Sequence, residues 1–162
     1  MRDERIFVVG VGNIFLGDDG FGVEVATRMR RRPLPDGVRV DDFGIRGVHL
    51  AYELLDGYDL VILVDTVDLN EEPGTIGVLE PELNGDGDVL PDAHDLDPVA
   101  VIGLLTGLGG SVGRMLVVGC QPATMEEQMG LSAPVEAAVD EAIKVVEELV
   151  QQHLSAYVSK EH

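Results

Sequence analysis

The chain has 162 residues, enough for one domain with a substantial core and short for two. Apolar residues make up 45% of it, so a packed interior is expected rather than disorder. Against 30 Asp and Glu there are only 11 Lys and Arg, which gives a formal net charge of −19. Nucleic acid and anionic membranes are therefore excluded as expected partners, because binding to phosphate needs clustered cations.

No targeting or membrane segment is evident. The longest apolar run, Leu60–Val64, is far shorter than the ~20 residues of a membrane-spanning helix. The first residues, MRDERIF, are charged and lead directly into a predicted strand, unlike a signal peptide. A single cysteine, Cys120, allows no internal disulfide and no Cys-based zinc site. We expect a cytoplasmic protein with one domain over residues 1–158 and a short tail over 159–162.

Strands and helices alternate in the first part of the chain. Continuous β-branched runs predict buried strands, and apolar residues spaced by three and four predict helices. The predicted segments are a strand over Arg5–Gly10, a helix over Phe21–Arg32, a strand over Val38–Phe43, a short helix over His49–Leu55 and a strand over Leu60–Asp65. The short helix should face inward with Leu50, Leu54 and Leu55. The basic run Arg28–Arg32 falls at a helix end, where cations interact favourably with the helix dipole.

The second part continues the alternation. A strand is predicted over Thr75–Leu79, and the link before it is too short for a crossover helix, so it should run antiparallel to its predecessor. The remaining segments are an acidic, exposed loop over Pro81–Leu96, a helix over Asp97–Gly107, a strand over Arg114–Gly119 and a long helix over Ala133–Tyr157 with Ser132 as its N-cap. Together these segments predict a three-layer α/β/α sandwich.

Candidate ligands follow several strands of this sheet. Asp18 and Asp19 lie in the Gly-rich turn of Val8–Val23 (VVGVGNIFLGDDGFGV), Asp65 ends the third strand, and His94 lies in the loop after the fourth. Sites in such sheets form beyond the carboxyl ends of the strands. We therefore expect Asp19, Asp65 and His94 to converge on one edge as metal ligands, while Asp18 can orient a ligand or act as a base.

Each candidate also has a purely structural interpretation. Asp18 or Asp19 can cap the helix that starts near Gly20, and Asp65 can cap a turn. His94, in the acidic sequence PDAHDLDP, can be a solvated histidine. The other histidines, His49, His153 and His162, are expected to be structural, and Cys120 is expected to be a small buried hydrophobe. Convergence is what favours a site for Asp19, Asp65 and His94.

Three other functional classes fit the sequence less well. A dinucleotide site would need a third glycine after Gly10 and Gly12, and it would place two aspartates against a pyrophosphate. A phospho-receiver also has acidic residues after strands one and three, but it needs a Lys after the last strand, where this chain has Gly119-Cys-Gln-Pro122. A serine hydrolase of the G-x-S-x-G type is excluded because the motif is absent.

The chain resembles the hydrogenase maturation endopeptidases, which trim a C-terminal extension from the large subunit of nickel–iron hydrogenases. The blocks that carry the resemblance lie in family order and span most of the chain: GVGNIFLGDDGFGV (10–23), DFGIRGVHLAYEL (42–54), LVILVDTVDLNEEPGTI (60–76), His94 and VVGCQPATMEEQMGLSAPVEAAV (117–139). The family's acidic metal ligand in the first loop is often Glu, whereas this chain has the shorter Asp19 at that position. The resemblance implies a phosphorylase/hydrolase-like α/β fold with a mixed, mostly parallel five-stranded sheet and helices on both faces.

The family's metal-contacting residues fall on Asp19, Asp65 and His94, so the resemblance implies that these three form both the catalytic and the metal site. It implies an aspartic-type endopeptidase, a monomer, whose partner is the large-subunit precursor. The nickel would be supplied by that substrate, with zinc or cadmium able to replace it in the isolated protein. Two alternatives remain open: a metal-binding maturation chaperone without peptidase activity, and a phospho-receiver-like signalling domain.

Overall fold

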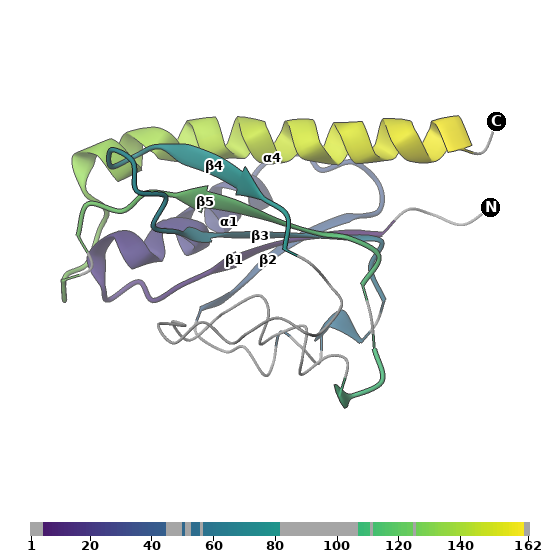
Figure 1. Ribbon diagram of the computed structural model, residues 1–162, viewed down its shortest axis with the longest axis horizontal. Helices are drawn as coiled ribbons and strands as arrows, with labels where there is room; N and C mark the ends of the chain where they lie inside the picture. The colour runs from purple at the N-terminus through teal and green to yellow at the C-terminus, as the bar shows by residue number, and fades with distance from the viewer. Residues whose placement is uncertain are drawn as a thin grey trace.

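A five-stranded sheet forms the centre of the molecule (Figure 1). The computed structural model describes residues 5–44, 50, 53–55, 57–81, 107–110, 112–124 and 126–160. In these ranges the strands are β1 (Ile6–Val11), β2 (Val38–Gly44), β3 (Leu60–Thr66), β4 (Ile76–Leu79) and β5 (Met115–Cys120). Their order across the sheet is β2-β1-β3-β5-β4, and only β4 runs antiparallel to its neighbour. This confirms the predicted mixed, mostly parallel sheet.

Strand β4 has the predicted direction but a different neighbour. It pairs with β5, with Ile76 opposite Cys120, and β5 lies between it and its predecessor β3. Two backbone hydrogen bonds extend the pairing beyond the strands, from Gly74 N to Gln121 O and from Gln121 N to Thr75 O, both at 2.9 Å. The short link after β3 therefore carries the chain to the sheet's edge.

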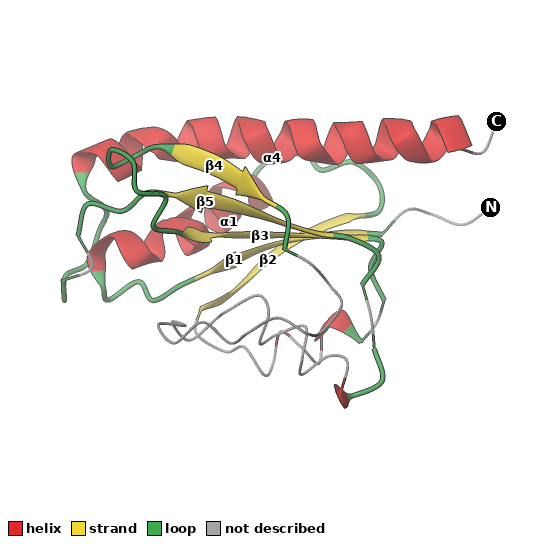
Figure 2. Ribbon diagram, viewed as in Figure 1, coloured by secondary structure: helices red, strands yellow, loops and turns green. Residues whose placement is uncertain are grey.

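Two helices cover one face of the sheet. Helix α1 (Phe21–Arg30) packs on β1, β2 and β3, and α4 (Ala133–Lys160) runs along the molecule over β5 and β4 (Figure 2). Their apolar residues join one core cluster with the sheet residues that point to the same side, including Ile6, Val8, Ile62, Val64, Val118, Phe21, Val25, Val135, Val139, Ala142 and Val146. The apolar spacing predicted these inward faces. No helix among the described residues is both long and apolar enough to cross a membrane.

The opposite face of the sheet has its own core. Alternate strand residues, Phe7, Val9, Val11, Val61, Leu63, Met115 and Val117, pack there with Leu50, Leu54 and Tyr58. Leu50 and Leu54 are buried, as predicted. The inward orientation of Leu55 was wrong: its side chain is 40% exposed, because the helical residues 53–54 give way to a turn there. The rest of that short helix, the acidic loop over 82–96 and the helix over 97–106 lie outside the described residues.

Glycines allow α1 to lie directly against the sheet. A Cβ added to Gly10 of β1 would lie 2.0 Å from the carbonyl oxygen of Gly22, and one added to Gly22 would lie 2.1 Å from that of Val64. No side chain fits in either place. The loop between β1 and α1 is therefore held close to the carboxyl end of β3.

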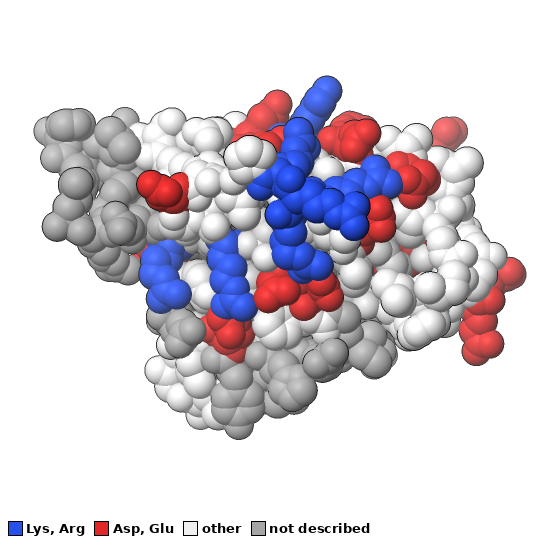
Figure 3. Space-filling model, turned by 180° about the vertical axis from the view of Figure 1, so that it is seen from behind, with Lys and Arg blue, Asp and Glu red and all other residues white. Residues whose placement is uncertain are grey.

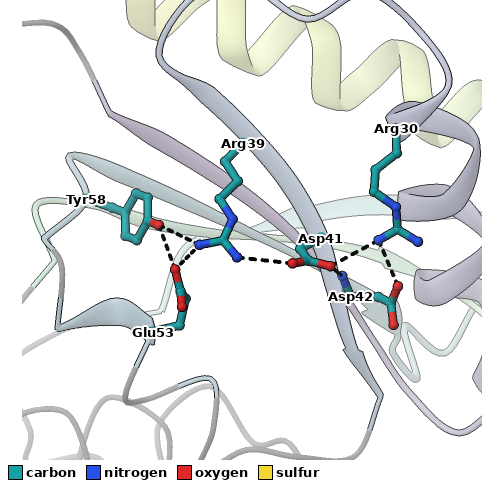
Figure 4. Close-up of polar contacts among 6 residues, drawn as sticks. All are labelled: Arg30, Arg39, Asp41, Asp42, Glu53 and Tyr58. Atoms are coloured by element: carbon teal, nitrogen blue, oxygen red, sulfur yellow. Dashed lines mark hydrogen bonds and ion pairs between the residues drawn. The ribbon is translucent and has the colours of Figure 1, made fainter.

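Arginine side chains link neighbouring elements on both faces of the sheet. Arg30 of α1 pairs with Asp41 and Asp42 of β2 at 3.2 and 2.8 Å (Figure 4). Arg39 of β2 contacts Asp41, Glu53 and Tyr58, which links the strand to the residues that follow it. Arg28 and Arg32 pair with acidic residues of α4. Most arginines of the basic run at the end of α1 are thus paired with acidic side chains.

Candidate functional site

The candidate site lies where the chain switches direction across the sheet. Strands β1 and β3 are neighbours, but the chain leaves β1 towards β2 at one edge and leaves β3 towards β4 at the other. In open α/β sheets such a switch point opens a crevice at the carboxyl ends of the strands, where ligands bind. Asp19 follows β1 in the short 3-10 helix Gly17–Gly20, and Asp65 lies near the carboxyl end of β3. Both therefore border the crevice.

Asp19 is fixed from two sides. The backbone N–H of Asn13 donates to its Oδ2 at 2.8 Å, and the hydroxyl of Thr66 donates to its Oδ1 at 3.2 Å. Gly12, with φ of 133°, passes so close that an added Cβ would lie 1.9 Å from the carbonyl oxygen of Asp19. The turn that positions this carboxylate therefore requires glycine at position 12.

Asp65 lies across the crevice and is oriented by the same threonine. Its Oδ1 accepts a hydrogen bond of 2.7 Å from the N–H of Thr66, whose hydroxyl lies 3.5 Å away. Burial of the Asp65 carboxyl and, secondly, the negative charge of Asp19 raise its pKa well above the ordinary value. The two carboxylates contact the same hydroxyl and repel each other. Binding of a cation or a proton between them is therefore favourable.

The sequence did not single out Thr66 or Asn13. Thr66 directly follows Asp65 in the VDT segment, and Asn13 follows Gly12 in the turn, so both were visible as polar residues beside candidate ligands. A periodicity argument cannot show that a hydroxyl from β3 reaches a carboxylate that lies 47 residues away in sequence.

Asp18 has a different role from its neighbour. Its side chain is completely buried and accepts four hydrogen bonds, from the N–H groups of Ala123, Thr124 and Ser132 and from the Ser132 hydroxyl, at 2.6–3.0 Å. Burial alone would raise the pKa of Asp18, but these hydrogen bonds outweigh it and lower the pKa. Asp18 therefore ties the first loop to the segment between β5 and α4, and its orientation leaves no role as a helix cap.

The third predicted ligand cannot be placed. His94 lies outside the described residues, as do His49 and His162, while His153 lies on α4 as expected. Among the residues that the structure describes, no group of three or more His, Cys, Asp or Glu could hold a metal ion. The structure thus brings Asp19 and Asp65 together, and the role of all three residues as ligands stays a prediction.

Cys120 is unsuited to nucleophilic chemistry. Its side chain is completely buried in the core beneath α4. Burial and, secondly, the charge of Asp18 raise the pKa of the Cys120 thiol to about 11, so the thiolate is scarce at neutral pH. The prediction of a small buried hydrophobe is confirmed.

Comparison with known proteins identifies the family. A sequence profile described as hydrogenase maturation protease matches residues 23–149, which is most of the chain. The chain belongs to the hydrogenase maturation protease family. It is thus related to peptidases, and the family resemblance seen in the sequence is confirmed.

Individual members of the family are similar over nearly their full length. A Methanocaldococcus jannaschii protein named as a candidate hydrogenase maturation protease is 36% identical, covering 90% of this chain and 96% of its own. The hydrogenase 2 maturation protease of Escherichia coli is 32% identical, with 88% of each chain covered. The structure of the E. coli hydrogenase maturating endopeptidase superposes with a TM-score of 0.78 and 30% identity over 92% of this chain and 93% of that one. The similarity in sequence and the similarity in fold therefore indicate the same family.

Proposed function

We propose that this member of the family is an endopeptidase that removes the C-terminal extension of a nickel–iron hydrogenase large-subunit precursor after nickel insertion. The observation that carries the proposal is the pair Asp19 and Asp65, held at the switch point by Thr66. The name of the E. coli relative, hydrogenase 2 maturation protease, supports a hydrogenase subunit as the partner. We expect the protein to act as a monomer in the cytoplasm.

The nickel in this proposal belongs to the substrate. Carboxylate oxygens from Asp19 and Asp65 and an imidazole from His94 make an incomplete set of ligands that suits nickel and leaves positions for groups of the precursor. A cation between the two carboxylates also relieves their mutual repulsion. Zinc or cadmium can take the same place in the isolated protein. Docking of a loaded precursor would thus complete the site, so that cleavage depends on nickel.

The charge distribution disfavours the phospho-receiver alternative. The described residues of 10–27, 57–81, 115–124 and 126–143 contain no Lys or Arg. A phosphoryl group on Asp65 would lie beside the carboxylate of Asp19, and the two negative charges would repel each other. The chaperone alternative uses the same ligands and differs only in the absence of cleavage.

The test compares nickel-loaded with nickel-free precursor from the same organism. Purified protein is incubated with each, and the intact mass of the precursor is measured. We expect loss of the extension from the loaded form only, with no effect of general serine, cysteine or pepsin-type inhibitors. Cys120→Ser is the control that should keep its activity, and Asp19→Asn should lose it. Equal cleavage of both precursor forms would contradict recognition through nickel, and binding without any cleavage would favour the chaperone.

A further inference from the structure

Large apolar side chains are exposed on the loops next to Asp19. Phe15 is 63% exposed and Met129 is 66% exposed, more than any other large hydrophobic residue in the described part of the chain, and Ile14 is 40% exposed. Exposed apolar side chains that lie close together often mark an interaction site. We call these three residues the Phe15–Met129 patch.

The two loops that carry the patch are joined by backbone hydrogen bonds. Gln128 N donates to Phe15 O at 3.0 Å, and Gly17 N donates to Gln128 O at 2.9 Å. The loops approach so closely that a Cβ on Gly17 would lie 3.2 Å from the carbonyl oxygen of Thr124. Met129 follows Gln128 directly, so the patch residues lie on adjoining backbone.

Hydrogen bonds connect the patch to the candidate site. Asn13 Oδ1 accepts a hydrogen bond of 2.9 Å from Phe15 N, while the N–H of the same Asn13 donates to Asp19. The buried Asp18 fixes the other loop through Thr124 and Ser132. The described residues of both loops are thus connected by hydrogen bonds to the turn that carries Asp19.

Charge indicates what kind of segment the patch would accept. Glu126 and Glu127 are exposed on the same loop as Met129, and the described residues of 10–27 and 126–143 contain no Lys or Arg. Several Lys and Arg side chains gather on the face seen in Figure 3. Arg28, Arg32 and Lys144 line a pocket between α1 and α4 together with Asp140. An acidic partner would be repelled at the patch, whereas a segment with Lys or Arg beside apolar side chains is complementary to it.

We propose that the Phe15–Met129 patch docks an apolar segment of the precursor that is flanked by Lys or Arg, and thereby holds the precursor beside Asp19 and Asp65. This inference rests on the proposed function, because the occupant is the protein that the peptidase cleaves. Phe15 and Met129 are then specificity-determining residues that act on binding and take no part in the chemical step.

The experiment uses the double variant Phe15→Ser/Met129→Ser. Steady-state cleavage of nickel-loaded precursor should show KM raised about tenfold or more, as expected for loss of a buried aromatic anchor, with kcat within about twofold of wild type. Binding of nickel-free precursor, which stays uncut, should weaken by a similar factor. The matched control is Val78→Ser/Leu79→Ser on the edge strand β4, which β5 separates from β3 and where the two side chains are 45% and 43% exposed.

The outcomes separate the two proposals. Unchanged KM and precursor affinity in a folded double variant would overturn the docking role, as would an equal loss in the β4 control. A wild-type dimer that the double variant dissociates with no change in precursor affinity would assign the patch to self-association instead. If precursor binding depends on the patch but no cleavage occurs, the docking proposal is supported and the proposed peptidase activity is contradicted. Binding that is insensitive to salt between about 50 and 500 mM would exclude the cationic flank.

Discussion

Two adjacent aspartates in the first loop have opposite roles because their surroundings differ. Asp18 points into the protein and receives four hydrogen bonds, which satisfy its charge within the fold. Asp19 points to the crevice, where one N–H and one hydroxyl orient it beside a second carboxylate. Residue type alone therefore does not distinguish a structural carboxylate from a candidate ligand. The number and direction of the hydrogen bonds that the carboxylate accepts distinguish the two.

Asp18→Asn should destabilise the protein while leaving the arrangement of Asp19 and Asp65 unchanged. An amide cannot accept from all four donors, because its NH₂ group must face at least one N–H or O–H, and such a mismatch costs about 1–3 kcal/mol. The check is the free energy of unfolding in denaturant at pH 7. The pKa of Asp18 is lower in the folded protein than in the unfolded chain. The carboxylate therefore stabilises the fold fully at a pH above its unfolded pKa, and this stabilisation is lost as pH falls through its folded pKa. The wild-type advantage should hence shrink below about pH 4.

Asp65→Asn should trade activity for stability. Burial and the charge of Asp19 raise the pKa of Asp65 in the folded protein. The protonated carboxyl therefore favours folding at low pH, and this advantage is lost as pH rises through the pKa that Asp65 has in the folded protein. At neutral pH the neutral amide should therefore raise the free energy of unfolding, on the order of 1 kcal/mol for a partly hydrated like-charge contact. Thermal unfolding in the presence of a chelator measures this. The control is Glu71→Gln, an exposed change on the following loop that should have no effect.

At the scale of the elements, the packing of α1 on the sheet depends on the absence of side chains. Gly22→Ala would place a Cβ 2.1 Å from the Val64 carbonyl oxygen and 2.5 Å from that of Val11. We expect a loss of about 1–3 kcal/mol or more from this overpacking, in spite of the better helix propensity of alanine. Chemical denaturation measures the loss. Gly107→Ala, where nothing lies within 4 Å, is the matched control and should be nearly neutral.

The strands and the helices on the α1 side could be predicted because they are encoded locally. The apolar spacing of Phe21, Val25 and Met29 is enough to orient α1, and the continuous run of β3 is enough to mark a buried strand. The pairing partner of β4 and the donors to Asp18 could not be predicted. They join residues as far as 114 positions apart, and no local period reports such contacts.

The candidate site was predictable to the same limited extent. Strand ends locate Asp19 and Asp65 at one edge, because the carboxyl ends of parallel strands meet there. The position of the Thr66 hydroxyl between them and the structural role of the Asp18 carboxylate become visible only when the loops are folded against each other. The position of the crevice could therefore be predicted from strand ends, whereas the hydrogen bonds within it depend on contacts between distant segments.

At the scale of the whole molecule, the formal net charge of −19 should weaken the fold at neutral and alkaline pH. Self-repulsion of this size is reduced by salt and by protonation of carboxylates. We therefore expect the free energy of unfolding at pH 8 to rise when salt is added, and to rise at low salt as pH falls from about 8 towards 5. The raised pKa of Asp65 acts in the same direction, because its protonation is easier in the folded protein.

The lowered pKa of Asp18 acts in the opposite direction and should limit this gain. Below about pH 4 protonation removes the acceptor that holds the loop before α4, so stability should pass through a maximum and then fall. The measurement is a series of denaturant titrations across pH at low and high salt, for wild type and Asp18→Asn. The variant should keep the rise caused by charge repulsion but show a shallower decline at acid pH. A wild-type profile that is flat in salt at pH 8, or an acid decline of equal slope in both proteins, would contradict this division between global repulsion and one buried carboxylate.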